Sequence, residues 1–236
     1  MQDTVDIFWS FRSPYSYLVT PDLIALREEY DVKVALRTVL PIALRAKTTV
    51  FDASDKKRPR YIVLDSKRRA QMLGLSFVWP KPDPVVQDRS TYDVPDEQPY
   101  IWRLSALGIE AERRGRGIDF AFHVATLLWS GTREWDKGEY LAEATKKAGL
   151  DLAELEAAVA GTDVWSQIEQ NHKDLEEAGH WGVPTAVFKG EPFFGQDRID
   201  TLRWRLDQVG LNRSGSKIPH TPSSNMDVGE DVWTSK

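Results

Sequence analysis

The sequence predicts an α/β protein in which a βαβ unit and a ββα unit share one sheet and enclose a long helical insertion. Three observations carry this prediction: apolar strand-like runs near the start, mostly helical periodicity in the middle, and short strand-like runs after residue 179. The chain has 236 residues, 41% of them hydrophobic, which suits one globular domain with a large insertion.

The first unit is predicted from residues 5–9 (VDIFW) and 32–40 (VKVALRTVL), which are typical of buried strands. Between them, Ser13 followed by Pro14 indicates a helix start, because serine caps free amides and proline suits the first helical position. Pro21 predicts a kink or a restart within that helix. A strand, helix, strand order favours parallel strands with a right-handed crossover.

The rest of the chain is predicted as helices followed by a hairpin and a last helix. The predicted helices lie near residues 58–73, 98–115, 117–130, 137–148 and 151–177, and the proline-rich WPKPDP (79–84) interrupts them. Residues 183–188 and 192–195 predict a hairpin, followed by a helix from Asp197 to about Val209. Residues 213–236 are polar and predict a flexible C-terminal tail.

The composition narrows the function classes. Lysine and arginine number 31 against 36 acids, a net charge of -5, so we expect neither a nucleic-acid partner nor binding to an anionic membrane. No apolar run approaches the ~20 residues that cross a bilayer, and the N-terminus lacks signal-peptide features, so a cytoplasmic location is expected. The chain has no cysteine and four scattered histidines, which predicts no disulfide, no dithiol exchange and no metal site.

Four segments, in order, resemble one family. They are FWSFRSPYSYL (8–18), YIVLDSKRRAQMLGL (61–75), LLWSGTREWDKGEYLAEATKKAGLD (127–151) and GHWGVPTAVFKGEPFFGQDRIDTL (179–202). They are similar to segments of the 2-hydroxychromene-2-carboxylate isomerases and kappa-class glutathione transferases, a DsbA-like branch of the thioredoxin fold. The resemblance implies a discontinuous thioredoxin-like domain, residues 1–40 and 179–212, with an all-helical domain, residues 41–178, inserted in it.

The resemblance gives Ser13 a catalytic role. Redox members of the fold carry C-x-x-C where this chain has Ser13, Pro14, Tyr15 and Ser16, so the sulfur would come from bound glutathione, whose thiolate Ser13 would stabilise. Lowering a thiol pKa from about 8.5 by ~2 units needs roughly 2.7 kcal/mol. One charge-assisted hydrogen bond of ~1.5–3 kcal/mol and the helix N-terminus suffice. The alternative is that Ser13 only caps the helix.

The resemblance also implies the glutathione-binding residues. Gly182, Val183 and Pro184 are similar to the family's G-V-P, in which the proline is cis and the residue before it offers backbone groups to the cysteinyl part of glutathione. An ordinary trans proline is the alternative. Gln196 and Asp197 are similar to residues that bind glutathione at the last helix, with Asp197 as a partner for the γ-glutamyl ammonium. Alternatively, Asp197 caps that helix.

Departures from the family pattern point to the substrate side of the site. Arg12 stands before the serine, where the family is often apolar, and is either a solvated loop charge or a group that helps hold an anionic substrate or the thiolate. Ser16 and Trp181 are further candidate substrate-site residues, and His180 stands beside Trp181. The family's G-N-x-P-P and F-P-x-N-T segments are replaced by residues 46–61 and by VWPKPDP (78–84).

The function implied by the resemblance is a glutathione-dependent isomerase. Its small-molecule substrate would be a conjugated aromatic-derived acid, to which the thiol adds reversibly. Two alternatives stay open: a kappa-like glutathione transferase that keeps the conjugate as product, and a non-catalytic DsbA-fold binding module. Because relatives are commonly dimers, a homodimer is expected.

Overall fold

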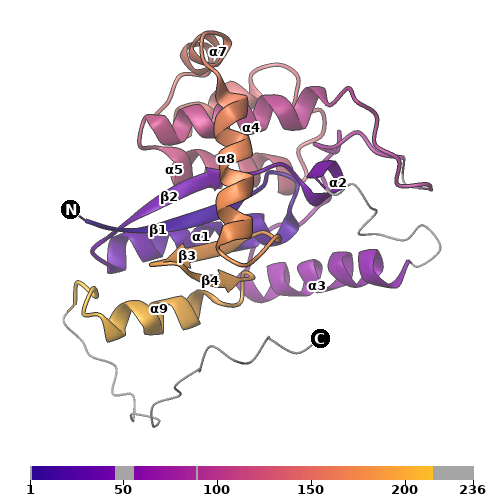
Figure 1. The fold of residues 1–236 in the computed structure, drawn as a ribbon. Coiled ribbons are helices and arrows are strands. Elements are labelled where there is room, and N and C mark those ends of the chain that lie inside the picture. The colour runs from indigo at the N-terminus through magenta and orange to yellow at the C-terminus, as the bar shows by residue number, and fades with distance from the viewer. Residues whose placement is uncertain (1, 46–55, 89, 215–236) are drawn as a thin grey trace, which may run out of the picture.

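A four-stranded mixed sheet lies at the centre of the computed structural model, which describes residues 2–45, 56–88 and 90–214. Its strands are β1 (Asp3–Trp9), β2 (Val32–Thr38), β3 (Thr185–Phe188) and β4 (Glu191–Phe194), in the order β2-β1-β3-β4 (Figure 1). β1 is parallel to β2 and antiparallel to β3, and β3 pairs antiparallel with β4. The predicted α/β fold, with βαβ and ββα units around one sheet, is confirmed.

Helix α1 (Pro14–Glu29) connects β1 to β2 and runs without a break. The predicted restart at Pro21 is wrong, because Pro21 lies inside one continuous helix, and the alternative of a kink stays a prediction. Proline has no amide hydrogen to offer the carbonyl of Tyr17. The hydroxyl of Thr20 donates to that carbonyl at 2.7 Å instead, so the acceptor stays satisfied and the helix continues.

Seven helices of the described residues lie between β2 and β3, and one follows β4. They are α2 (Ile42–Arg45), α3 (Lys57–Leu73), α4 (Pro99–Arg113), α5 (Gly117–Trp129), α6 (Tyr140–Lys147), α7 (Leu152–Ala160), α8 (Val164–Glu177) and α9 (Ile199–Gln208). The single helix predicted over 151–177 is wrong. The chain turns at residues 161–163, and the Asp163 carboxylate caps a new helix by accepting the amides of Trp165 and Ser166, each at 3.1 Å.

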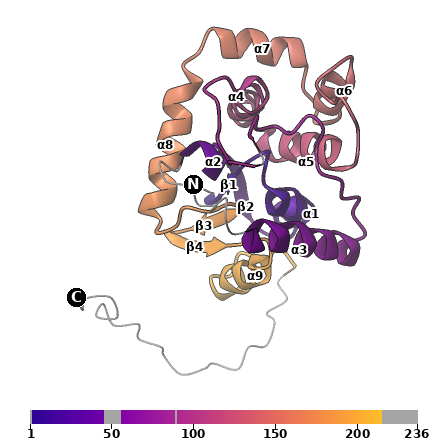
Figure 2. The same ribbon diagram turned by 90° about the vertical axis from the view of Figure 1, so that its right-hand side faces the viewer.

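The helices lie on both sides of the sheet. Figure 2 shows α8 on one side of the strands and α1 on the other, and Figure 1 shows α4 and α7 beyond β2 and α9 beyond β4. A single hydrophobic cluster nevertheless joins the parts, because it contains Val5 of β1, Leu18 of α1, Leu128 of α5 and Leu202 of α9. The inserted helices therefore share one core with the sheet, and a smaller cluster of Ala106, Ile109, Val164 and Ile168 packs between α4 and α8.

The chain after α9 returns to the body of the molecule. The backbone amide of Arg213 donates to the Glu29 carbonyl at 2.9 Å, and its Nε donates to the Tyr30 carbonyl at 3.0 Å. The first residue of the predicted flexible tail is thus held in place, and residues 215–236 lie outside the described residues. Among the helices that the structure describes, none has both the length and the apolar character needed to span a membrane.

Candidate active site at the start of α1

A cavity of about 500 Å³ lies beside the N-terminus of α1. Its wall is drawn from that turn, from α2, from the first turns of α3, from residues 79–92, and from the loop that enters β3. Ser13 and Val183 both line it. The segment that contains the predicted catalytic serine therefore meets the segment that contains the predicted cis proline at one hollow, as expected of a ligand site.

Ser13 makes two hydrogen bonds at this position. Its Oγ accepts the amide of Ser16 at 3.1 Å, so it is the N-cap of α1. Its hydroxyl also donates to the Val183 carbonyl at 3.4 Å, a long and hence weak bond. Capping leaves the hydroxyl proton available, so the same side chain can begin the helix and donate to a ligand atom at the cavity wall.

Two hydrogen bonds and a cis peptide bond define the loop before β3. The Val183–Pro184 peptide bond is cis, as the resemblance implies. The Pro184 carbonyl accepts the Gly195 amide at 2.9 Å, and the Gly182 carbonyl accepts the Thr185 hydroxyl at 2.8 Å. Within the described residues the amide of Val183 has no acceptor, so it is available to a peptide-like ligand.

Aromatic side chains form one side of the cavity. Trp181 is 45% exposed and Phe194 is 44% exposed, and both line it. The His180 ring stacks against both, with ring centroids 3.9 Å from Phe194 and 5.5 Å from Trp181. Burial lowers the pKa of His180, and its Nδ1 accepts the Gly182 amide at 2.9 Å. The ring is therefore neutral at pH 7 and positions the loop.

Arg12 and Arg45 both line the cavity, but only Arg12 forms an ion pair with a carboxylate of the described residues. The Arg12 guanidinium pairs with the Asp83 carboxylate. Arg45, by contrast, donates to the Leu40 and Trp181 carbonyls at 2.7 and 2.8 Å, and no ion pair joins it to a carboxylate of the described chain. Burial lowers its pKa, and the negative charge of Glu176 offsets part of that effect. A partly buried cation of this kind is stabilised by an anionic ligand.

Of the other predicted site residues, Arg12 and Trp181 line the cavity and Ser16 does not. Ser16 is fully buried, and its Oγ accepts the Ser10 amide at 3.4 Å. The prediction that Ser16 is a substrate-site residue is therefore wrong. The alternative that Arg12 is a solvated loop charge is wrong, since its side chain is only 18% exposed.

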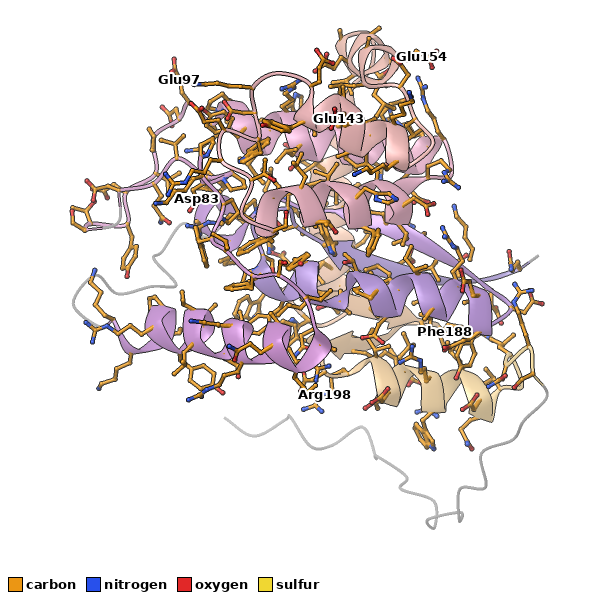
Figure 3. All side chains as sticks on the ribbon, turned by 180° about the vertical axis from the view of Figure 1, so that it is seen from behind. Asp83, Glu97, Glu143, Glu154, Phe188 and Arg198 are labelled. Carbon is orange, nitrogen blue, oxygen red and sulfur yellow. The ribbon has the colours of Figure 1, made fainter. Side chains whose placement is uncertain are left out.

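Gln196 and Asp197 lie outside the cavity wall. Gln196 is 9% exposed and its Oε1 accepts Arg69 Nε at 2.7 Å. Asp197 is half exposed and lies 3.6 Å from Arg198, and it does not cap α9, because Arg198 occupies the N-cap position. In Figure 3, Arg198 lies near one end of α3, and Asp83 lies well apart from it. The glutathione-binding role of Gln196 and Asp197 stays a prediction.

Several wall residues were not predicted from the sequence. Arg45, Asp83 and Phe194 line the cavity. Of these, only Arg45 stands out in the sequence, because it is a charged residue at the end of the otherwise apolar segment PIALR.

The described residues contain no group of three histidine, aspartate or glutamate side chains that could hold a metal ion.

The comparisons with known proteins agree with this architecture. The family model of the DsbA-like thioredoxin domain matches residues 4–207, and the chain belongs to that family. The 2-hydroxychromene-2-carboxylate isomerase of Pseudomonas putida is 22% identical over 214 residues, which are 87% of this chain and 95% of the relative.

Two solved structures are similar in fold. A 2-hydroxychromene-2-carboxylate isomerase structure has a TM-score of 0.64 at 21% identity and covers 87% of this chain and 95% of its own. A cytosolic disulfide reductase from Pseudomonas aeruginosa, solved with GSH, has a TM-score of 0.54 at 16% identity and covers 86% and 98%. At these identities both likenesses show the fold.

Proposed function

We propose that the protein is a glutathione-dependent isomerase of the 2-hydroxychromene-2-carboxylate isomerase type. The observation that carries the proposal is the Ser13 hydroxyl, which stands at the N-terminus of α1 and reaches the Val183 carbonyl across the cavity wall. The isomerase relative supports the reaction class. The chain has no cysteine, so a reacting sulfur must come from a bound thiol, and dithiol exchange by the protein's own residues is chemically excluded.

The residues at the wall suit a peptide thiol. The Val183 amide would pair with the cysteinyl backbone as an added strand does, and Ser13 would donate to the sulfur. Gln196 and Asp197 are assigned to the γ-glutamyl end. When bound, glutathione supplies a sulfur nucleophile that adds to the substrate and leaves again without net oxidation or reduction.

Ser13 and the helix end act on the charge of that sulfur. A hydrogen bond from a neutral hydroxyl to an anion contributes about 1.5–3 kcal/mol. The exposed amides of the first turn of α1 add positive potential, worth about 0.3–1 kcal/mol at a helix N-terminus. These two contributions match the roughly 2.7 kcal/mol that a thiol pKa two units lower requires.

The remaining wall suits an aromatic-derived acid as the small-molecule substrate. Pro41, Ile42, Pro59, Ile62 and Val63 contribute apolar surface, which excludes water from the reacting atoms. Trp181 and Phe194 offer flat faces to a ring. We assign the substrate carboxylate to Arg45, because its hydrogen bonds go to two backbone carbonyls and the only carboxylate charge that acts on it within the described residues is that of Glu176, outside ion-pair distance, whereas Arg12 is paired with Asp83.

The test is calorimetric titration with glutathione, followed by product analysis with 2-hydroxychromene-2-carboxylate. We expect binding at millimolar glutathione or below, turnover of the acid, and no net loss of thiol. Thiol loss equal to product would establish a kappa-like transferase instead. Absence of binding at millimolar glutathione would leave a non-catalytic module and end the proposal. Light scattering on the same sample tests the expected homodimer.

A further inference from the structure

We propose that Arg12 is a positioning residue, whose ion pair with Asp83 fixes residues 79–87 as the substrate-side wall of the cavity. Arg12 directly precedes Ser13 in the chain, and Asp83 belongs to the proline-rich segment that interrupts the helices. The inference builds on the proposed function, since the wall matters for catalysis only where a substrate binds beside Ser13.

The pair between these two side chains is close and largely buried. Arg12 Nε donates to Asp83 Oδ1 at 3.2 Å, and Arg12 Nη2 donates to Oδ2 at 3.3 Å. The Arg12 side chain is 18% exposed and that of Asp83 is 15% exposed. A two-point pair fixes orientation as well as distance, and at this burial the loss of one partner strands the other charge.

Asp83 also organises its own segment. Its Oδ2 accepts the Trp79 indole N–H at 2.9 Å, and its Oδ1 accepts the Val85 amide at 3.0 Å. Arg12 Nη2 donates further to Gln87 Oε1 at 3.0 Å, and its guanidinium carbon lies 5.7 Å from the Trp79 ring centroid. Trp79, Asp83 and Gln87 all line the cavity, so one hydrogen-bonded network forms this wall.

The segment needs such a tie because it contains no helix or extended strand. Between α3 and α4 the described residues form only turns and an isolated bridge from Lys81 to Arg133. Further anchors come from α5 and from the loop between α5 and α6: the Val78 amide donates to the Trp129 carbonyl, and the Trp135 indole to the Pro82 carbonyl, each at 2.8 Å. Arg12 connects the wall to the turn that presents Ser13.

Two departures from the family pattern therefore form a single unit. Arg12 replaces a residue that is often apolar, and WPKPDP replaces the F-P-x-N-T segment; in the structure the two are in contact. Because Asp83 neutralises Arg12, the arginine contributes little net charge at the sulfur. The ion pair instead affects how well the substrate fits the cavity, and we therefore expect its loss to change the Michaelis constant of the substrate.

The experiment compares Arg12→Ala and Asp83→Asn with the charge-swapped double variant Arg12→Asp/Asp83→Arg. Arg27→Ala is the matched control, because Arg27 makes a similar two-point pair with Asp119, at 2.9 and 3.0 Å, between α1 and α5 and away from the cavity. Hydrogen exchange of the amides of residues 79–88 is measured on each protein without glutathione. We expect exchange at least tenfold faster in both single variants, wild-type rates in the control, and partial recovery in the double variant.

Kinetics with glutathione and 2-hydroxychromene-2-carboxylate then test the consequence. We expect the single variants to raise the Michaelis constant of the acid about five- to twentyfold, and the charge-swapped double variant, which leaves no charge unpaired, to keep the pKa of the bound thiol unchanged. Unchanged exchange in Arg12→Ala overturns the tie, and a thiol pKa shifted in the double variant reassigns Arg12 to the sulfur and overturns its positioning role. Faster exchange in a protein whose wild type has no turnover supports the tie and refutes the proposed function.

Discussion

The Ser13 hydroxyl lies 3.4 Å from the Val183 carbonyl oxygen, although 170 residues separate them in the chain. They meet because β1, which leads to Ser13, pairs antiparallel with β3, which follows Val183, from Val5 opposite Phe188 to Phe8 opposite Thr185. The sheet register therefore determines the distance across the candidate site. Substitutions at Ser13 or Val183 are therefore expected to weaken ligand binding more than they destabilise the fold.

Replacing Ser13 with alanine separates chemistry from helix capping. The variant loses the N-cap of α1, a cost of about 1 kcal/mol, and it loses the hydrogen bond to the glutathione sulfur. We expect a folded protein in which the pKa of bound glutathione thiol rises by about one to two pH units. The thiolate absorbance in the ultraviolet, followed against pH, measures it.

Asp163→Ala is the matched control for that experiment. Asp163 caps α8 through the amides of Trp165 and Ser166, so its loss costs a similar stability without touching the cavity. The control should leave the thiolate titration unchanged. If both variants behave alike, Ser13 is a cap only.

Stability should fall in mild acid through His172. Its Nε2 accepts the Leu40 amide at 3.0 Å, and burial lowers its pKa from 6.5 to about 4. Above pH 6.5 the ring is neutral in both states, so it has no effect. Between pH 6.5 and 4 the unfolded chain binds a proton that the folded chain does not, and stability decreases as the pH falls, by an order of 1–2 kcal/mol after allowance for partial exposure.

Urea unfolding at several pH values tests this expectation. His172→Gln keeps an acceptor for the Leu40 amide without a titrating ring, so its stability should depend less on pH across the same window. If the free energy of unfolding changed equally with pH in both proteins, the acid sensitivity would come from groups other than His172.

Adding a methyl group at Gly182 should disturb the aromatic side of the cavity. A Cβ there would lie 2.5 Å from Phe194 Cε2 and 3.0 Å from His180 Cε1, so the Phe194 ring must move off His180. Gly182→Ala is expected to lose about 0.5–1.5 kcal/mol of stacking and to weaken glutathione binding in calorimetry. In Phe194→Ala the added methyl should cost much less, and full additivity of the two changes would argue against the clash.

The contact between α4 and β2 should tolerate no methyl group at Gly108. A Cβ would lie 2.7 Å from Thr38 Oγ1 and 3.1 Å from Phe11 Cε2, and Phe11 is fully buried. Gly108→Ala is therefore expected to destabilise by about 1–3 kcal/mol in urea unfolding. Gly161→Ala, whose nearest contact is 3.8 Å, should stay within about 1 kcal/mol of the parent.

Local signals predicted much of the fold. Ser13 and Pro14 marked the start of α1, and the hairpin of β3 and β4 followed from two apolar runs around a tight turn. The split between α7 and α8 was missed although Gly161 and Asp163 form a stop and a start. Continuation through Pro21 depends on one hydroxyl, that of Thr20, which periodicity does not report.

The candidate site was predictable on one side only. The residues of the turn at Ser13 and of the Val183 loop follow a motif, and both line the cavity. Arg45 and Asp83 belong to segments whose place depends on tertiary packing, so no spacing in the sequence points to them. Ser16 stands three residues after Ser13, yet the turn of the helix directs it into the core, where it is fully buried.

The sheet order β2-β1-β3-β4 has a consequence for the newly made chain. During translation, β1 and β2 emerge first and can pair, but the partner for the other edge of β1 emerges about 180 residues after it. Until then a buried, apolar strand edge stays open to other chains. A ribosome-bound fragment that ends before β3 therefore leaves this edge unpaired, and residues 181–194 close both the edge and the cavity once they emerge.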